Sequence, residues 1–487
     1  MKTLVTISIL VSLAIGAYFF YFNSTKQRAH SIAVIPFESL RSEPGQEFLI
    51  DGVTEGILNS LSQQEGLKVS ARSSSFQFRG GTIALQDIAT KLGVQAIVEG
   101  AVDIDGDRIQ IVVQLINAED QMHLWSQRFE GNVDEIFSIQ DKIANSIAKA
   151  LLSSSRRVVT QRTTNKEAYE LYLKGRSHWN LRTQLELLKG VEAFEEAIEK
   201  DPEFGAAYAG LADCYTALGY ASFLSPKESF PKAFDAATKA LKLDTTLAEA
   251  HATLGFYQFY YEWDWAEAEQ EFRKAISINP NHELAYDWYG YYLTAMQRYD
   301  EAQVVFAKAA SLDPLSAGIG TDMGFSLYYD KQYDQASEAL RAALKLNPNF
   351  PLAHIWLGRV YQVKKMYDQS IDEYKKALTV MSGWPVAYAQ IGNVYGVSGN
   401  HQQARVILDS LNSFATKKFV TSYGMALVYA GVGEKTKVYE WLNKAYDERS
   451  HWLVWLNVDP RWDEFRSDPQ FTELLARISL PEQMSNP

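Results

Sequence analysis

The residues of this sequence that could do acid–base, nucleophilic or metal chemistry are scattered, and none forms a catalytic motif. Asp103, Asp105 and Asp107 alternate around a turn as in a calcium loop, but the other ligands and the closing glutamate are missing. Serines 73–75 lack a GxSxG context, no histidine pair forms HExxH, and no phosphate-binding glycine loop occurs. Cys214 is the single cysteine, which excludes an internal disulfide. We therefore predict a protein that is not an enzyme and holds no metal or cofactor.

The charge balance argues against nucleic acid as a partner. The 487 residues include 47 Lys and Arg against 59 Asp and Glu, which gives a net charge of −12 and a pI near 5.3. No long basic run interrupts this acidic surface, so it would repel a phosphate backbone over most of its area. A protein or peptide is the expected macromolecular partner, and the sequence names no small-molecule ligand.

The second half of the chain repeats itself at a fixed interval. Residues 299–314, YDEAQVVFAKAASLDP, return in altered form as residues 333–348, YDQASEALRAALKLNP. Pro280, Pro314 and Pro348 follow one another at intervals of 34 residues, and small residues recur at fixed offsets within each unit. Proline ends a helix, and small residues let helices approach closely. Each unit is therefore predicted to be a helical hairpin that buries its apolar face by stacking on its neighbours.

These units resemble the tetratricopeptide repeat, whose pattern is a large residue, a Leu-Gly pair, a Tyr, then Ala, Phe, Ala and Pro. The match is specific for four units that start near Glu283, Ala317, Pro351 and Pro385, and it is looser on both sides of them. We expect about eight units over residues 166–449. The resemblance implies an all-α superhelical solenoid that binds protein or peptide partners.

One face of the first helix in each unit should line the concave side of the stack. The predicted groove on this side runs from aromatic to polar and consists of Phe256, Phe259, Asp287, Tyr291, Phe325, Tyr328, Arg359, Gln362 and Asn393. These residues do not reproduce the carboxylate clamp of chaperone-binding tetratricopeptide domains. We expect instead a segment with apolar anchors and acidic residues near Arg359. The alternative is that the aromatic residues only shield neighbouring helices.

Residues 31–155 change period repeatedly, which is typical of a small mixed α/β domain, here in the order βαβαβββα. Asp105 and Gly106 lie between two alternating runs and predict a tight hairpin turn. The segments SIAVIPFESL and LGVQAIVEGAVDIDGDRIQIVVQLINA resemble the TolB amino-terminal-like or FlgO-like domain that precedes tetratricopeptide arrays in bacterial signalling proteins. Residues 450–487, which contain the aromatic run HWLVW, are expected to form a carboxyl-terminal cap and tail.

Residues 3–22, TLVTISILVSLAIGAYFFYF, carry no charge and would span about 30 Å as a helix. The alternative is a cleaved signal peptide, but the run is long for one and no A-x-A site follows it. We therefore predict a transmembrane anchor within residues 1–30 and a single-pass inner-membrane protein with a periplasmic body. Lys2 against Lys26 and Arg28 gives little charge bias for that orientation.

These features predict an α+β chain: an amino-terminal transmembrane helix, a small mixed α/β domain, and an all-α tetratricopeptide superhelical solenoid. We expect a membrane-anchored, non-catalytic bacterial scaffold that binds a protein or peptide partner in its concave groove. The alternative is a regulatory subunit that senses a ligand through its α/β domain. It would act on a separate cyclase, kinase or transcription factor, because the chain begins at its predicted span.

Overall fold

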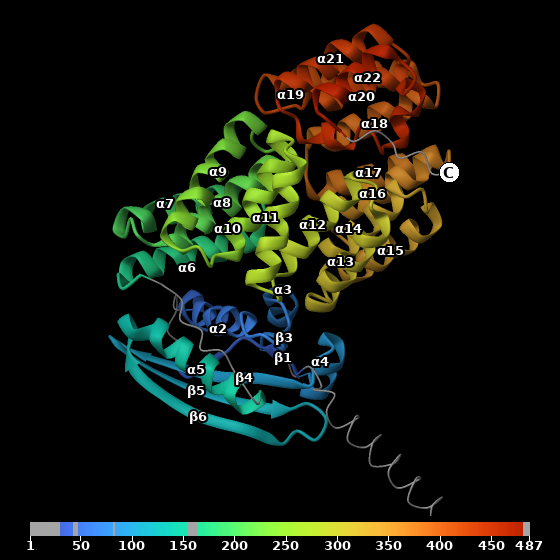
Figure 1. Cartoon of the computed structure of the whole chain (residues 1–487). Coiled ribbons are helices and arrows are strands. Elements are labelled where there is room, and N and C mark those ends of the chain that lie inside the picture. The colour runs from blue at the N-terminus through green and yellow to red at the C-terminus, as the bar shows by residue number, and fades with distance from the viewer. Residues whose placement is uncertain (1–29, 42–46, 81–82, 153–162, 481–487) are drawn as a thin grey trace, which may run out of the picture.

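A computed structural model describes residues 30–41, 47–80, 83–152 and 163–480. These residues form a small sheet domain followed by a long helical array (Figure 1). In Figure 1 the sheet domain, coloured blue to cyan, lies beneath the array, which curves from green through yellow to red.

The sheet domain is built on one six-stranded sheet, with strand order β3-β1-β4-β5-β6 and a short β2 paired to β4. Strand β1 runs parallel to β3 and β4, whereas β4, β5 and β6 form an antiparallel meander. Gly106, with φ of 61°, makes the predicted tight turn between β4 and β5. The strands are β1 (His30–Val34), β2 (Glu38–Ser39), β3 (Leu67–Val69), β4 (Ala96–Asp105), β5 (Arg108–Asn117) and β6 (His123–Asn132).

Helices cover both faces of this sheet. Helices α2 (Glu47–Ser62) and α5 (Ile136–Leu151) share one apolar core with it, and α4 (Leu85–Leu92) packs in a second core. Adjacent residues of β4 point into different cores: Ala96 and Val98 belong to the first core and Ile97 to the second. This alternation is expected for a strand with helices on both faces. The order β1-α2-β3-α4-β4-β5-β6-α5 is the one that the sequence predicts. Additional short elements are α3 (Arg72–Ser75), η1 (Phe76–Phe78) and η2 (Val133–Glu135).

The array forms eight helical hairpins between residues 166 and 447, where every residue is described. In each hairpin the first helix also contacts the first helices of the neighbouring hairpins. The hairpins are α6 (Lys166–Leu181) with α7 (Gln184–Lys200), α8 (Gly205–Tyr220) with α9 (Pro226–Leu243), α10 and η3 (Ala248–Tyr257 and Gln258–Glu262) with α11 (Trp265–Ile278), α12 (Glu283–Ala295) with α13 (Tyr299–Leu312), α14 (Ala317–Tyr329) with α15 (Tyr333–Leu346), α16 (Pro351–Val363) with α17 (Tyr367–Val380), α18 (Pro385–Val397) with α19 (His401–Ala415), and α20 (Ser422–Val432) with α21 (Lys435–Asp447).

A glycine at a fixed place in the first helix lets the two helices of a hairpin approach closely. A Cβ atom on Gly290 would lie 2.5 Å from Cζ of Phe306, and one on Gly324 would lie 2.6 Å from Cγ of Leu340. Both distances are shorter than van der Waals contact, so a larger residue would push the hairpin apart. The small residues of the repeat therefore set the spacing of its helices.

The chain continues past the last hairpin as a C-terminal segment, defined here as residues 450–480. It contains η4 (His451–Trp455), η5 (Pro460–Phe465) and α22 (Pro469–Arg477). Trp455 and Trp462 of this segment are among the largest fully buried side chains of the described residues. The segment is therefore part of the core of the array.

Two predictions are wrong on the present structure. They are the transmembrane helix in the fold and the single-pass inner-membrane protein with a periplasmic body. None of the helices in the described ranges is long and apolar enough to cross a membrane. The longest of them, α9, has 18 residues and includes several charged ones. Residues 3–22, where the span was predicted, lie outside the described residues. The described fold is a mostly helical solenoid with a small amino-terminal sheet domain.

Candidate functional site on the concave face

All nine residues that the sequence assigns to a partner-binding groove lie on the first helices of successive hairpins. The structure places Phe256 on α10, Phe259 on η3, Asp287 and Tyr291 on α12, Phe325 and Tyr328 on α14, Arg359 and Gln362 on α16, and Asn393 on α18. None of these side chains is more than 7% exposed. The five aromatic ones belong to a single buried cluster. The positions are therefore brought together on the inner side, but they are covered.

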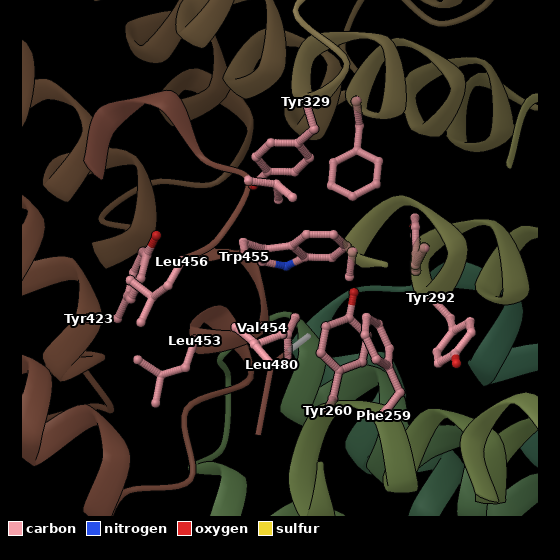
Figure 2. Close-up of a cluster of buried hydrophobic side chains, with 14 of the residues drawn as sticks. Phe259, Tyr260, Tyr292, Tyr329, Tyr423, Leu453, Val454, Trp455, Leu456 and Leu480 are labelled. Atoms are coloured by element: carbon pink, nitrogen blue, oxygen red, sulfur yellow. The ribbon is translucent and has the colours of Figure 1, made fainter. Parts of the chain in front are cut away.

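The C-terminal segment contacts three of these residues, Phe259, Phe325 and Arg359, and the others are buried among neighbouring hairpins. The ring of Trp455 stacks on Tyr329, with centroids 5.1 Å apart and planes at 9°, and meets Phe325 edge-on at 4.8 Å. Phe259 and Tyr260 approach the same indole with centroid distances of 5.9 and 6.1 Å. Figure 2 shows Trp455 between Tyr329 on one side and Tyr260 and Phe259 on the other. An aromatic anchor from the same chain thus fills the groove.

A local insertion shapes the site for this anchor. The third hairpin has one residue more between its glycine and its proline than the two hairpins that follow it. The extra residue is accommodated by the π-helical turn η3, which ends at Trp263 with a φ of 61°. Such turns are rare and are frequent at functional sites. Here the turn carries Phe259 and Tyr260, the two residues that contact Trp455 from below in Figure 2.

The array curves until distant hairpins meet. The indole Nε1 of Trp384, just before α18, donates to the carbonyl oxygen of Ala221, just after α8, over 3.4 Å. Nη1 of Arg449, after α21, donates to the carbonyl oxygen of Tyr261 over 3.3 Å. Hairpins from both halves of the array therefore surround the C-terminal segment.

The polar part of the predicted groove joins neighbouring hairpins. Gln362 donates to Oδ1 of Asn393 at 2.6 Å, and Nδ2 of Asn393 donates to the carbonyl oxygen of Leu427 at 2.6 Å. The guanidinium carbon of Arg359 lies 4.0 Å from the centre of the Trp356 ring. These polar residues thus hold α16, α18 and α20 side by side.

Two buried carboxyl groups lie beside the aromatic part of the groove. Asp287 is 4% exposed and Asp322 is 7% exposed. Burial raises the pKa of Asp322 to about 7, and a hydrogen bond from Tyr291 opposes the rise. Burial, and then the charge of Asp322, raise the pKa of Asp287 well above its ordinary value. At neutral pH this pair therefore carries less than two full negative charges.

The sheet domain contacts the array in part through the loops between hairpins. Asn281, between α11 and α12, accepts from the backbone N–H of Val69 at 3.1 Å. Its Nδ2 donates to the carbonyl oxygens of Ser62 and Leu67, both at 2.8 Å. One side chain thus satisfies three backbone groups at and beside the edge strand β3, which would otherwise be unpaired.

A buried ion network reinforces the same interface. Glu55 of α2 accepts from Nε of Arg176 on α6 at 3.0 Å, and its Oε2 forms an ion pair with Nε of Arg72 at 2.8 Å. Nη1 of Arg176 lies 3.4 Å from Oδ2 of Asp213 on α8. Burial disfavours the charge of Glu55, but Arg176 and Arg72 outweigh it and hold the pKa below its ordinary value. The network connects the sheet domain to the first two hairpins.

The serine and aspartate candidates of the sequence have structural partners. Ser73 and Ser74 both donate to the carboxylate of Asp313, which joins α3 to the loop after α13. Asp107 forms an ion pair with Lys166 at the start of α6, with 3.0 Å between Oδ1 and Nζ. These contacts position the sheet domain on the array.

The histidine and cysteine candidates also lie in packed surroundings. Nδ1 of His251 lies 2.6 Å from Glu271, and Nδ1 of His354 lies 2.6 Å from Glu373, in each case across one hairpin. Cys214 is buried, and burial raises the pKa of its thiol. Within the part of the chain that the structure describes, no group of three or more His, Cys, Asp or Glu residues could hold a metal ion.

Sequence reasoning missed the residues of the C-terminal segment that enter the groove. Trp452, Trp455, Asp459 and Arg461 were expected only in a terminal cap. A signal was present: the run HWLVW is too apolar to stay exposed. The predicted groove offered it an aromatic surface of matching chemistry.

Two stretches of the array match known repeat families. Residues 324–365 match the family described as TPR repeat, and residues 284–314 match the family described as tetratricopeptide repeat. The array contains tetratricopeptide repeats. Such repeats indicate a protein-interaction scaffold, and their fold is typically non-catalytic. The matched stretches of this tetratricopeptide array include Tyr291, Phe325, Tyr328 and Arg359 of the predicted groove.

Three curated proteins are similar to parts of the chain. The putative adenylate cyclase 3 of Rhizobium meliloti is 30% identical over 234 residues, which are 46% of this chain and 39% of that protein. The transcriptional regulator HilA of Salmonella typhimurium is 22% identical over 56% of this chain and 49% of its own length. The Hsp70-Hsp90 organizing protein of Triticum aestivum is 24% identical over 20% of this chain and 15% of its own. The chain thus spans less than half the length of each of these relatives.

Solved structures also resemble parts of the chain. The Cut9-Hcn1 hetero-tetramer of APC/C has a TM-score of 0.43 at 17% identity and covers 71% of this chain and 59% of that one. Pseudomonas aeruginosa pilF has a TM-score of 0.32 at 20% identity, with 48% and 97% covered. YrrB, described as a TPR protein with an unusual peptide-binding site, has a TM-score of 0.27 at 21% identity, with 39% and 93% covered.

Proposed function

We propose that this chain is a non-catalytic scaffold that binds a protein or peptide partner through the concave face of its tetratricopeptide array. The observation that carries this proposal is the position of Trp455, because an aromatic side chain packed on these residues favours an aromatic anchor in a partner. The indole of Trp455 is surrounded by aromatic rings at centroid distances of 4.8 to 6.1 Å. Buried aromatic anchors of this kind supply most of the binding energy at protein interfaces.

The same segment indicates the polar requirement of a partner. Asp459 follows Trp455 by four residues and is fully buried. Burial disfavours its charge, but the charges of Arg461 and Arg359 hold the pKa of Asp459 below its ordinary value. A partner that replaces the segment is therefore expected to present an aromatic residue followed by an acidic one, the latter close to Arg359.

Binding in this way requires the C-terminal segment to leave the groove, which gives a direct test. Full-length wild type, Trp455→Ala and the double variant Trp455→Ala with Phe325→Ala would be compared in affinity purification with mass spectrometry. Circular dichroism would confirm that each variant is folded. We expect Trp455→Ala to capture more of the wild-type partner, and the double variant to lose that gain.

A matched control lies on the outer surface. Val304 on α13 is 70% exposed, so Val304→Asp should leave the capture unchanged. Capture that falls with Val304→Asp and does not respond to Trp455→Ala would place the partner on the convex side and contradict the proposal.

A second candidate is a regulatory module, favoured by the buried contact between the two parts of the chain. The sheet domain, which resembles TolB amino-terminal-like or FlgO-like domains, would sense a ligand for a separate cyclase, kinase or transcription factor. The Glu55–Arg176–Asp213 network connects it to the inside of the array. The names of two relatives, an adenylate cyclase and a transcriptional regulator, support this direction.

This candidate predicts that a substitution in the sheet domain changes hydrogen exchange in the groove. Glu55→Gln should increase hydrogen exchange in residues 451–465, because it weakens the network that positions α6 and α8. If exchange in this stretch is the same in Glu55→Gln and wild type, the two parts are not coupled and the regulatory candidate fails.

A further inference from the structure

One charged side chain inside the array lacks the partners that its burial requires. Arg359 of α16 is 0% exposed, and its guanidinium carbon lies 4.0 Å from the ring centre of Trp356 and 5.4 Å from that of Trp452. Its Nε donates to Oε1 of Gln390 at 3.3 Å. Among the described residues, its Nη1 and Nη2 atoms have no hydrogen-bond partner. A buried guanidinium normally has these four N–H groups satisfied.

The local charge count is also unbalanced. Arg461 forms a fork with Asp459, with its Nε 2.9 Å from Oδ1 and 3.1 Å from Oδ2. Asp459 and Arg461 have side chains that are 0% and 4% exposed, so this ion pair is as buried as Arg359. Within the described ranges Arg359 forms no ion pair, so two buried guanidinium groups share one carboxylate. An uncompensated charge of this kind is strongly unfavourable unless an anion joins it.

Further hydrogen-bond donors lie around the guanidinium. Trp452, whose ring faces Arg359, has an Nε1 atom without a partner among the described residues, and the same holds for the hydroxyl groups of Tyr328 and Tyr329. Both tyrosine rings contact Trp356, with centroid distances of 5.7 and 5.5 Å, and the guanidinium carbon of Arg359 lies 4.0 Å from the centre of that same ring. Each of these donors comes from a residue that is intermediate in exposure or buried.

We propose that Arg359 anchors a binding site for a small oxyanion, a carboxylate or a phosphate, between α16 and the C-terminal segment. The two free Nη groups form the planar fork that binds such groups with two parallel hydrogen bonds. Trp356 of α16 and Trp452 of the C-terminal segment flank the guanidinium, so the ligand is a small molecule as long as the segment fills the groove.

The site has a consequence for the groove, and this consequence rests on the proposed function. Arg359 belongs to the array and Trp452 to the C-terminal segment, so an anion bound between them favours the arrangement in which the segment fills the groove. Binding of the anion and binding of a partner would then oppose each other.

The test uses the full-length chain with inorganic phosphate and succinate as probes, each against sodium chloride at equal ionic strength. Thermal unfolding and isothermal titration calorimetry would be followed for wild type, Arg359→Met and Arg405→Gln, the last an exposed arginine on α19. We expect at least one oxyanion to raise the Tm of wild type and Arg405→Gln saturably. Arg359→Met should lose this response and be at least as stable as wild type in chloride, because it removes a buried charge.

The proposal is overturned if Arg359→Met keeps the wild-type response, or if neither oxyanion binds wild type more than chloride does. Should Arg359→Met not fold, Arg359→Lys keeps the charge without the planar fork. It should weaken oxyanion binding by about tenfold or more, and unchanged affinity would overturn the proposal.

Partner capture in saturating oxyanion separates the proposed anion site from the proposed partner groove. Tight oxyanion binding without an effect on capture removes only the link to the groove.

Discussion

The two ends of the chain contact the same array by different means. The sheet domain docks on α6 and on the loops between hairpins with hydrogen bonds and ion pairs, such as those of Asn281 and Arg176, and Tyr169 and Leu173 of α6 join its apolar core. The C-terminal segment docks on the concave face with aromatic rings centred on Trp455. Polar contacts fix a position because each donor needs its acceptor, whereas aromatic contacts stabilise in proportion to the area they bury. We therefore expect the C-terminal contact to carry most of the stability and the amino-terminal contact to set the geometry.

The largest effect is expected from removal of the aromatic anchor. Trp455→Ala should lower the free energy of unfolding by about 3–5 kcal/mol, because it leaves a cavity among four aromatic rings. The conservative variant Trp455→Phe should lose much less, because a smaller ring still fills part of the space. Chemical denaturation measures both, and equal losses for Ala and Phe would show that the ring does not pack as described.

A smaller loss is expected at the polar contact. Asn281→Ala leaves the N–H of Val69 and the carbonyl oxygens of Ser62 and Leu67 without their partner, which should cost about 1–3 kcal/mol. The array contains its own control, since residues 347–349 repeat the sequence Asn-Pro-Asn of residues 279–281, and Asn349 is exposed. Asn349→Ala should change stability by less than about 0.5 kcal/mol. Equal effects of the two variants would mean that the sheet domain does not dock through this loop.

A third effect is a pH dependence of the groove. The folded-state pKa of Asp322 is raised by burial to about 7 from 3.8, so the folded chain binds more protons than the unfolded chain between these values. The contribution of this group to stability is therefore present below about pH 4 and is lost as the pH rises to about 7. Wild type should lose stability relative to Asp322→Asn over this window, as measured by unfolding at a series of pH values.

Asp334 provides the matched control for that series. It is exposed, and a hydrogen bond from Lys364 holds its pKa below the ordinary value. The contribution of Asp334 to stability has the opposite sign, because it is lost as the pH falls. This loss is confined to more acidic solutions, where the pH reaches the lowered pKa. A difference between wild type and Asp322→Asn that does not change with pH would refute the burial of Asp322.

The repeat period and the hairpin spacing could be predicted because both depend on local chemistry. Proline after the second helix and glycine opposite a large ring, as in Gly290 with Phe306, act within one unit and recur in the next. The same periodicity placed Phe256, Tyr291 and Phe325 on one side of the array. The hairpin at Asp105 and Gly106 was predictable for a similar reason, since its turn is decided by two adjacent residues.

The occupant of the groove could not be predicted, because it depends on contacts between residues far apart in sequence. Trp455 lies 126 residues after Tyr329 and belongs to no repeat, so no period connects the two. The docking of Asn281 on β3 has the same origin, because Asn-Pro-Asn reads only as a turn. The predicted transmembrane helix was wrong for a different reason, because an uncharged run of residues was taken to determine the fold class, and none of the helices in the described ranges is long and apolar enough to cross a membrane.

The central claim is that residues of the C-terminal segment fill the concave face of the tetratricopeptide array. Its most direct test is to replace Trp455 with the photoreactive aromatic residue p-benzoylphenylalanine in the full-length chain and to map the crosslinks by mass spectrometry. A large aromatic side chain keeps the packing, and the crosslinks report its neighbours. We predict intramolecular crosslinks to α14 around Phe325 and Tyr329 and to η3 around Phe259 and Tyr260. Crosslinks confined to α20, α21 and the segment itself would show that the segment is only a terminal cap and would contradict the account.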